Sequence, residues 1–218
     1  MFIIRRKIRS AFIRLRRFVV SGRFGASPDT VYGDVFYDDG GFEKTQATAV
    51  SITAYLMRRY NPTSVLDVGC GMGNYLACFA EYGCAAVGVE GSSYGIARVP
   101  GTVLAIQHDL RTRLLMNKKF DLVMCVEVAE HVSRKYSEVL VDSICTHAKH
   151  MVLFTAAPPG TPGTDHINCQ PREFWDKLFL KHGFTVDEQG TAELVKHAVA
   201  SDTAVWFKKW AYIYSRQA

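Results

Sequence analysis

The stretch Ser64-Val-Leu-Asp-Val-Gly-Cys-Gly-Met-Gly-Asn-Tyr75 carries the strongest structural signal in the chain. Its mostly apolar residues 65–68 predict a short buried strand, and a helix is predicted to begin at Asn74. Between them the backbone can approach a ligand closely, because the turn contains three glycines: Gly69, Gly71 and Gly73. Strand, glycine turn and helix in this order are typical of nucleotide-binding folds.

Two details distinguish this turn from a dinucleotide-binding fingerprint. Asn74 stands where that fingerprint has its third glycine, and Asp67 lies two residues before the first glycine. A carboxylate at Asp67 repels a pyrophosphate but suits a ligand that carries positive charge. S-adenosylmethionine (SAM) has a sulfonium, an ammonium and an adenosine, and it has no phosphate. The stretch therefore resembles motif I of the class I SAM-dependent methyltransferases.

Predicted strands and helices alternate along most of the chain. The strands are predicted at 65–68, 85–89, 103–107, 120–126, 151–156, 184–188 and 204–214. The helices are predicted at 42–60, 74–82, 133–149 and 172–182. This alternation predicts an α/β fold. The resemblance implies a Rossmann-like seven-stranded class I methyltransferase sheet, mostly parallel with one antiparallel strand, flanked by helices.

Acidic residues follow the second and third predicted strands, at the sheet edge where α/β folds bind ligands. Glu90 is placed to accept hydrogen bonds from both ribose hydroxyls of a nucleoside, and Gly91 and Ser92 follow it directly. The resemblance implies that Asp109 accepts a hydrogen bond from the adenine amino group and that Leu110 offers its backbone N–H. The alternative for Asp109 is that it caps a turn.

The fourth predicted strand leads into Glu127, Glu130 and His131, which form an E-x-x-E-H pattern. A helix beginning near Glu127 would place the three side chains on one face. Two carboxylates and an imidazole suit Mg²⁺, Mn²⁺, Fe²⁺ or Zn²⁺. The pattern resembles one that holds a metal in ubiquinone-pathway and small-RNA O-methyltransferases. The whole stretch 120–132 resembles motif IV of the class I methyltransferases, which implies that Cys125 borders the methionine end of SAM. The alternative is a pocket lining without metal.

A Gly/Pro-rich loop follows the fifth predicted strand. Within it His166 is the natural further metal ligand or base, and Asn168 and Gln170 are expected to face the substrate. Trp175 is expected to pack the next helix onto the sheet. The N/D-P-P-Y/F signature of amino-group methyltransferases does not match here, because alanine and glycine stand in its key positions: Ala157 and Gly160.

Three motifs together resemble one bacterial-type group of class I methyltransferases. They are Phe36-Tyr37-Asp38, Glu127–His131 with the sequence E-V-A-E-H, and Asp165–Trp175 with the pattern D-H-x-N-x-Q-P-x-x-F-W. The resemblance implies acceptors among glycans or small metabolites. Tyr32, like Tyr37, lies in a linker-like segment that is able to cover a cofactor.

Positive charge is concentrated at the N-terminus. Residues 1–28 hold eight Lys/Arg and no acid, whereas the other 190 residues hold 18 bases and 21 acids. Residues 1–20 carry apolar side chains at helical spacing, which fits contact with a membrane surface, contact with nucleic acid, or a packing extension. We therefore expect a basic arm at 1–28, a linker with an N-terminal helix at 29–60, and a methyltransferase domain at 61–218.

The composition indicates a globular protein with free thiols. Apolar residues make up 48% of the chain, no apolar run is long enough to span a membrane, and the six cysteines form no C-x-x-C pair. We expect a cytoplasmic protein that is able to associate with a membrane surface through its arm.

The predicted reaction is methyl transfer from SAM to a hydroxyl of a small molecule or glycan. His131 or His166 would accept the acceptor proton. Alternatively, a divalent metal held by Glu127, Glu130, His131 and His166 would lower the hydroxyl pKa. Two other functions remain open: an RNA 2′-O-methyltransferase, and a non-catalytic SAM-binding or membrane-docking protein. A main domain without excess positive charge disfavours a nucleic-acid acceptor.

Overall fold

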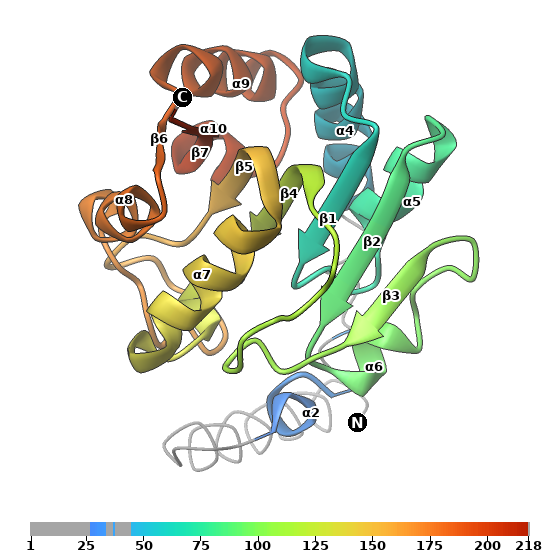
Figure 1. The fold of residues 1–218 in the computed structure, drawn as a ribbon, viewed down its shortest axis with the longest axis vertical. Coiled ribbons are helices and arrows are strands. Elements are labelled where there is room, and N and C mark those ends of the chain that lie inside the picture. The colour runs from blue at the N-terminus through green and yellow to red at the C-terminus, as the bar shows by residue number, and fades with distance from the viewer. Residues whose placement is uncertain (1–26, 34–36, 38–44, 218) are drawn as a thin grey trace, which may run out of the picture.

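The computed structural model describes residues 27–33, 37 and 45–217, and its strands form one sheet (Figure 1). The sheet has seven strands in the order β3-β2-β1-β4-β5-β7-β6. Their bounds are β1 Ser64–Val68, β2 Ala85–Glu90, β3 Leu104–Gln107, β4 Phe120–Val126, β5 Ala148–Thr155, β6 Phe184–Val186 and β7 Ala211–Arg216. Strand β7 pairs antiparallel with both β5 and β6, and the other pairs are parallel. The predicted sheet is therefore confirmed.

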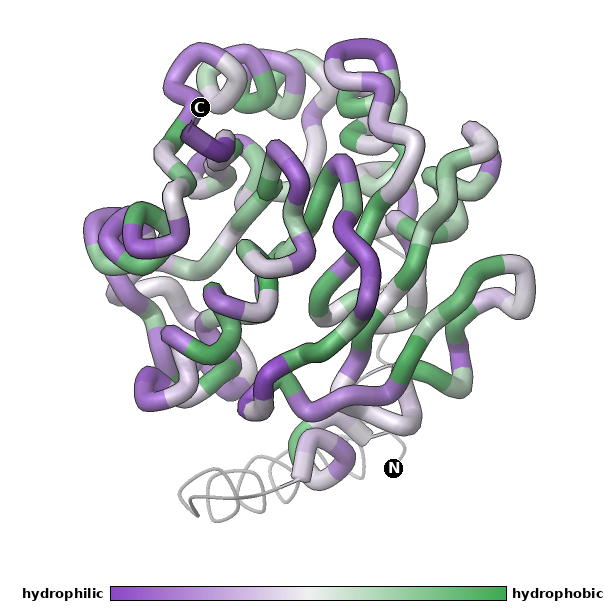
Figure 2. Tube along the Cα trace, in the orientation of Figure 1, coloured by the Kyte–Doolittle hydropathy of each residue, from purple (hydrophilic) through white to green (hydrophobic). Residues whose placement is uncertain are grey.

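Helices cover both faces of the sheet because the buried strands are apolar on both sides. One face packs against α7 (Ser137–His147) and α8 (Arg172–Lys181). The other packs against α4 (Gln46–Tyr60), α5 (Asn74–Glu81), α9 (Glu188–Ala200) and α10 (Val205–Lys209). Successive residues alternate between the two cores, as Val65 and Leu66 do. The central strands are mostly green in Figure 2, and purple residues gather on the outer turns of peripheral helices.

The C-terminal third differs from the prediction. Helix α9 was not predicted, although Asp187 marks its start by accepting a hydrogen bond from the Gly190 amide at 2.9 Å. The segment predicted as one strand, 204–214, holds the short helix α10 followed by β7. Its aromatic residues favour a strand by propensity. In the structure Phe207 instead lies in α10, and its side chain is fully buried. The predicted helix 133–149 is also too long, since β5 begins at Ala148.

Strand order reverses between β1 and β4, so a crevice is expected outside the carboxyl ends of these two strands. The arrowheads of β1, β2 and β3 point to one edge of the sheet, where the short helices α2 (Pro28–Val31) and α6 (Ser93–Ile96) lie (Figure 1). Because β7 runs antiparallel, its first residues come to this same edge, beside the end of β5.

Gly69 provides a test of how tightly the glycine turn is packed. It has φ +82°, and an added Cβ would lie 2.3 Å from Cγ2 of Val128. Gly83 has nearly the same φ, +75°, but nothing lies within 4 Å of its added Cβ. Gly83→Ala should therefore cost only the left-handed backbone penalty, about 1–2 kcal/mol. Gly69→Ala should cost a further 1–3 kcal/mol, approximately, for overpacking.

The free energies of unfolding, measured by urea denaturation, check this expectation. Adding Val128→Ala to Gly69→Ala should recover the steric part of the loss and leave the backbone part. Equal losses for the two single glycine variants would show that Val128 moves aside at no cost, contrary to the prediction.

Candidate functional site

The glycine turn and the end of β2 are joined by Glu90. Its Oε2 accepts from the Gly71 amide at 2.9 Å, and its Oε1 accepts from the Ser92 amide at 2.8 Å. The side chain is 9% exposed. Burial raises the pKa of Glu90, and the hydrogen bonds to Ser92 and Gly71 oppose that rise. The structure therefore brings together the turn and the acid that the sequence assigned to the ribose.

Asp67 lies at the end of β1 and is 2% exposed. Burial and, second, the charge of nearby Glu90 raise the pKa of Asp67 to about 7. Two buried carboxylates at one sheet edge are costly unless positive charge lies near them. This edge therefore suits a cationic ligand, as the sequence predicts.

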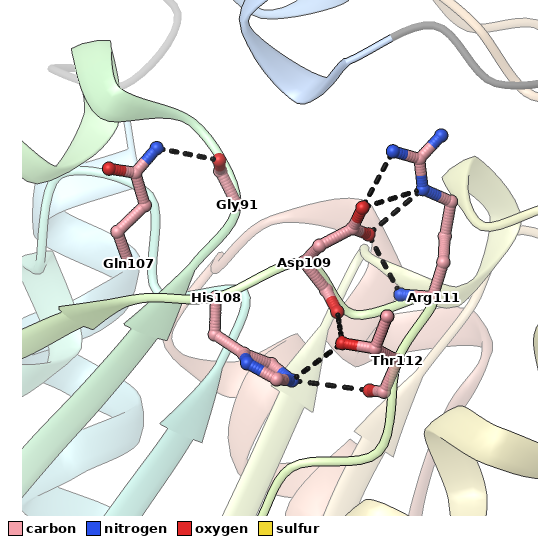
Figure 3. A network of polar contacts seen from close by, with 6 residues as sticks. All are labelled: Gly91, Gln107, His108, Asp109, Arg111 and Thr112. Atoms are coloured by element: carbon pink, nitrogen blue, oxygen red, sulfur yellow. Dashed lines mark hydrogen bonds and ion pairs between the residues drawn. The ribbon is translucent and has the colours of Figure 1, made fainter.

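The Asp109 carboxylate is held by Arg111, two residues further along the chain (Figure 3). Both carboxylate oxygens accept from Nε of Arg111, at 2.9 and 3.0 Å, and Oδ1 also accepts from the Arg111 amide at 2.9 Å. These hydrogen bonds lower the pKa of Asp109. They match the turn-capping alternative. The adenine contact of Asp109 and the amide contact of Leu110 stay predictions.

A short N-terminal segment packs against the end of β2. Asp29 accepts from the Ser93 amide at 2.6 Å and from the Ser93 hydroxyl at 2.9 Å. The Ser92 hydroxyl donates to the carbonyl of Tyr32 at 2.6 Å. An added Cβ on Gly91 would lie 3.0 Å from Cγ of Pro28. The segment thus covers the residues that follow Glu90.

Tyr32 connects this region with the E-x-x-E-H residues. Its ring meets the His131 ring edge-on, with centroids 5.7 Å apart. Burial and the charges of Asp165 and Glu90 raise the pKa of Tyr32 well above its ordinary value. The sequence marked Tyr32 only as an aromatic in a linker, and it gave no signal for Asp29.

The side chains of Glu127, Glu130 and His131 do not lie on one helix face. The prediction of a shared face is therefore wrong. Glu127 has φ +55°, in the left-handed region, so the chain turns sharply where β4 ends. Ala129–His131 then forms a 3-10 helix. This backbone directs Glu127 toward the end of β5 and carries Glu130 and His131 toward the loop that holds His166.

Glu130, His131 and His166 form a compact group. Each offers one ligand atom, and these atoms all lie within 4.8 Å of one another. Glu130 is fully buried; its Oε1 accepts from the Ala157 amide at 3.2 Å, and its Oε2 has no hydrogen-bond partner in the described part of the chain. An orphaned buried carboxylate oxygen beside two imidazoles fits a divalent cation.

The two imidazoles are oriented by backbone carbonyls. Nδ1 of His131 lies 3.2 Å from the Asp165 carbonyl oxygen, and Nδ1 of His166 lies 3.2 Å from that of Thr161. The rings are 5.0 Å apart at their centroids. Burial, followed by the charge of His166, lowers the pKa of His131 to about 4. A carbonyl at Nδ1 leaves Nε2 with a lone pair, which either a proton or a cation can use.

Glu127 lies outside this group of three. Its Oε1 accepts from Nε1 of Trp210 at 2.8 Å and from the hydroxyl of Thr155 at 2.9 Å. Burial raises the pKa of Glu127. Burial and the charge of Glu127 raise the pKa of Glu130. Sequence reasoning missed Trp210 and Thr155 as partners, since neither lies near Glu127 in the chain.

The loop after β5 is anchored by its own polar residues. Asn168 is 1% exposed, and its amide donates to the Ala129 carbonyl at 3.2 Å and to the Ser137 hydroxyl at 3.0 Å. Gln170 donates to Oδ1 of Asn168 at 3.0 Å. The expectation that Asn168 faces substrate is therefore wrong, because it holds the loop onto the 3-10 turn. Trp175 packs against Phe154 with ring centroids 5.2 Å apart, as predicted.

Other expectations concern the cysteines and the N-terminal arm. All six cysteines are free, and Cys125 is fully buried in β4. Within the described residues, no helix is both long and apolar enough to cross a bilayer. The basic segment 1–20, with its predicted membrane-surface contact, lies outside the described residues.

The fold and this sheet edge together define a class I SAM-dependent methyltransferase. A model of the family described as "Methyltransferase domain" matches residues 43–189, more than half of the chain, and the chain belongs to that family. The family assignment agrees with the predicted enzyme class and with SAM as its cofactor.

A curated relative is the ubiquinone biosynthesis O-methyltransferase of Hahella chejuensis (strain KCTC 2396). It is 27% identical over 157 residues, which cover 66% of this chain and 60% of the relative. The chain thus spans about 60% of the length of that protein.

Solved structures share the fold at low identity. Magnesium protoporphyrin IX methyltransferase from Synechocystis PCC 6803, with bound SAH, is 18% identical, with a TM-score of 0.59 and 95% of both chains covered. A sugar N-methyltransferase from Streptoalloteichus sp ATCC 53650 is 16% identical, with a TM-score of 0.65, covering 90% of this chain and 100% of that one. At these identities the likeness concerns the fold.

Asp67 should make the stability of the cofactor-free protein depend on pH. The folded pKa is raised to about 7 from an ordinary value of 3.8, so the stability contributed by the neutral carboxyl is complete below pH 3.8. It is then lost as the pH rises through 7. Asp67→Asn cannot ionise, so its melting temperature relative to the wild type should increase between these two pH values.

Thermal melts at several pH values, without SAM, check this prediction. Glu81→Gln, which changes an exposed carboxyl instead of a buried one, is the control. A difference between Asp67→Asn and the wild type that stays constant from pH 4 to pH 8, approximately, would contradict the buried-carboxylate argument.

Proposed function

We propose that this protein transfers the methyl group of SAM to a hydroxyl oxygen of a small molecule or saccharide. The observation that carries the proposal is the group Glu130, His131 and His166 at the carboxyl edge of the sheet. Imidazoles and a carboxylate there are suited to activating a hydroxyl, directly or through a cation. The curated O-methyltransferase relative supports the choice of oxygen as acceptor atom.

Cofactor binding is assigned to the turn and the strand ends beside it. The proposed set is Asp67, Gly69, Gly71, Gly73, Glu90, Gly91, Ser92, Asp109, Leu110 and Cys125. The polar contacts around Glu90 support the ribose subsite, and the buried charge of Asp67 supports a cationic ligand. Cys125 is fully buried, so its backbone is the part that would border the methionine end.

The acceptor must be placed in line with the departing sulfur and made more nucleophilic. The C–S bond of the sulfonium breaks and the sulfur leaves as a neutral thioether, so the chain needs no general acid. In the metal-free route, Nε2 of His131 or His166 takes the hydroxyl proton, and Glu130 stabilises the imidazolium that forms. A divalent cation bound by Glu130, His131 and His166 would instead lower the pKa of the acceptor hydroxyl.

We further assign the chain to the bacterial-type group that shares its three motifs, with a basic arm at 1–28, a linker and helix at 29–60, and the catalytic domain at 61–218. An RNA acceptor is disfavoured, because residues 29–218 hold more acids than bases.

Glu90 tests the cofactor subsite. Glu90→Gln keeps the side-chain shape but loses the charge that accepts two backbone hydrogen bonds, so SAM affinity should fall about 10–100-fold. Isothermal titration calorimetry measures it, with the exposed Glu81→Gln as the control. An unchanged dissociation constant in folded Glu90→Gln would refute the ribose assignment.

The acceptor site is tested with methyl-labelled SAM and a panel of saccharides, small hydroxyl compounds and RNA. We expect label on a saccharide or small molecule, suppressed by excess EDTA and restored by Mn²⁺ or Mg²⁺. His166→Ala should lose both Mn²⁺ binding and transfer, whereas the exposed His150→Ala should keep both. Full activity in EDTA would favour the metal-free histidine route, and label only on RNA would contradict the proposed acceptor class.

A further inference from the structure

Residues 27–33 form a strap that packs against the loop following β2. Its anchor is Asp29, whose Oδ1 accepts from the Ser93 amide at 2.6 Å and whose Oδ2 accepts from the Ser93 hydroxyl at 2.9 Å. Pro28 lies directly over Gly91, since a Cβ added to that glycine would be 3.0 Å from the proline Cγ. The strap is therefore fixed to this loop at two separate points.

Ser92 joins the strap to the carboxylate that is assigned to the ribose. Its amide donates to Oε1 of Glu90 at 2.8 Å, and its hydroxyl donates to the Tyr32 carbonyl at 2.6 Å. Ser92 is fully buried, and a buried hydrogen bond is electrostatically stronger than one in water. The carboxylate of Glu90 and the backbone of Tyr32 are thus positioned by the same residue.

The side chain of Tyr32 reaches the histidine pair. Its ring meets the His131 ring edge-on, with centroids 5.7 Å apart and planes at 87°. The His131 ring meets that of His166 in a similar way, with centroids 5.0 Å apart and planes at 76°. Edge-on arrangements at these distances are favourable.

The Tyr32 ring adds a restraint to His131 that its hydrogen bond does not supply. Nδ1 of His131 lies 3.2 Å from the Asp165 carbonyl oxygen. One hydrogen bond fixes the position of a ring nitrogen but leaves the plane of the ring free to rotate about it. The neighbouring aromatic ring restricts that rotation, and so it affects the direction of Nε2.

We propose that Tyr32 is a positioning residue that couples the cofactor loop to His131. This inference rests on the proposed function, in which Glu90 binds the SAM ribose and His131 serves the acceptor hydroxyl. A bound nucleoside fixes Glu90 and, through Ser92, the strap that holds the Tyr32 ring against His131. Coupling needs an element whose arrangement both sites bias, and the strap contacts both. The imidazole thereby takes its working orientation when the methyl donor is present.

Simple packing is the rival explanation. The strap would then only cover the loop after β2. Loss of the Tyr32 ring would lower the melting temperature without changing how His131 responds to the cofactor. The NMR signals of the His131 ring separate the two roles, because they report on that side chain alone.

The experiment follows the His131 ring by proton–nitrogen NMR of the full-length protein during titration with S-adenosylhomocysteine (SAH). SAH carries the ribose but no transferable methyl group, so it occupies the cofactor site without turnover. The His131 signals are identified by their absence in His131→Asn. We expect SAH to shift these signals in the wild type and to leave them unshifted in Tyr32→Leu. By calorimetry, SAH affinity in Tyr32→Leu should fall by no more than about 5-fold, the low end of coupling between two sites.

Two further tyrosine substitutions serve as controls. Tyr32→Phe keeps the aromatic ring and should retain the wild-type response of His131. Tyr82→Leu makes the leucine substitution at an exposed ring and should also retain it. A wild-type response in folded Tyr32→Leu would overturn the positioning role. A response lost in Tyr32→Phe would overturn it as well, because the ring contact would then not be the cause.

Asp29 gives an independent variant that decides the question if Tyr32→Leu does not fold. Asp29→Ala releases the strap from Ser93 but keeps the Tyr32 ring, so it should weaken the response of His131 to SAH. Asp202→Ala, at an exposed aspartate, is the matched control and should leave the response unchanged. A full response in folded Asp29→Ala would overturn the role of the strap.

The same titrations distinguish failure of this inference from failure of the proposed function. Wild-type SAH affinity in Glu90→Gln would remove the ribose subsite, and this inference with it. SAH binding that depends on Glu90, together with wild-type His131 signals that do not shift, would overturn only the link through Tyr32.

Discussion

The carboxyl edge of this sheet must accommodate four buried or half-buried carboxylates. They lie at or just after the ends of three adjacent strands: Asp67, Glu90, Glu127 and Glu130. Removing a carboxylate from water costs several kcal/mol, approximately, unless hydrogen bonds or positive charge replace the lost hydration. Much of the surrounding structure serves this need, from the glycine turn to the C-terminal tryptophan.

The four carboxylates are compensated to different degrees. Glu90 has two backbone amides, and Glu127 has an indole and a hydroxyl on one oxygen. Oε1 of Glu130 accepts from one backbone amide, and its Oε2 has no hydrogen-bond partner among the residues that the structure describes. Burial and the charge of Glu90 raise the pKa of Asp67. Asp67 and Glu130, the two least compensated carboxylates, thus mark two places at the sheet edge where a positively charged ligand would be stabilised.

The residues of the first place could be brought together from local sequence alone. The β1 turn is short, so residues 65–74 hold both the strand and the glycines that shape it. Glu90 follows from the parallel register, which pairs Asp67 with Gly88 and Val68 with Val89. The second place was predicted only in part. Periodicity assumed a helix at Glu127, but a left-handed residue there redirects the chain, and no sequence periodicity contains that information.

The missed partners of Glu127 have the same physical origin. Trp210 is 83 residues away, and it reaches the site because β7 inserts antiparallel between β5 and β6. Propensity read this region as one strand, so the turn of α10 that sets the direction of Trp210 was not available from sequence. A long-range hydrogen bond depends on strand order, which local pattern does not specify.

The two places also differ in the groups that surround the carboxylate, and this difference explains why the cofactor was easier to assign than the acceptor. Around Glu90 the partners are backbone amides, whose positions follow from the turn and the strand ends. Near Glu130 lie two imidazoles, one from a 3-10 turn and one from a loop. That loop is anchored by the Asn168 side chain at Ala129 and by the backbone amides of residues 167 and 168 at the Glu130 carbonyl. Contacts made by backbone amides follow from the local sequence of a turn or strand end. Contacts between side chains of distant segments form only when the sheet is assembled.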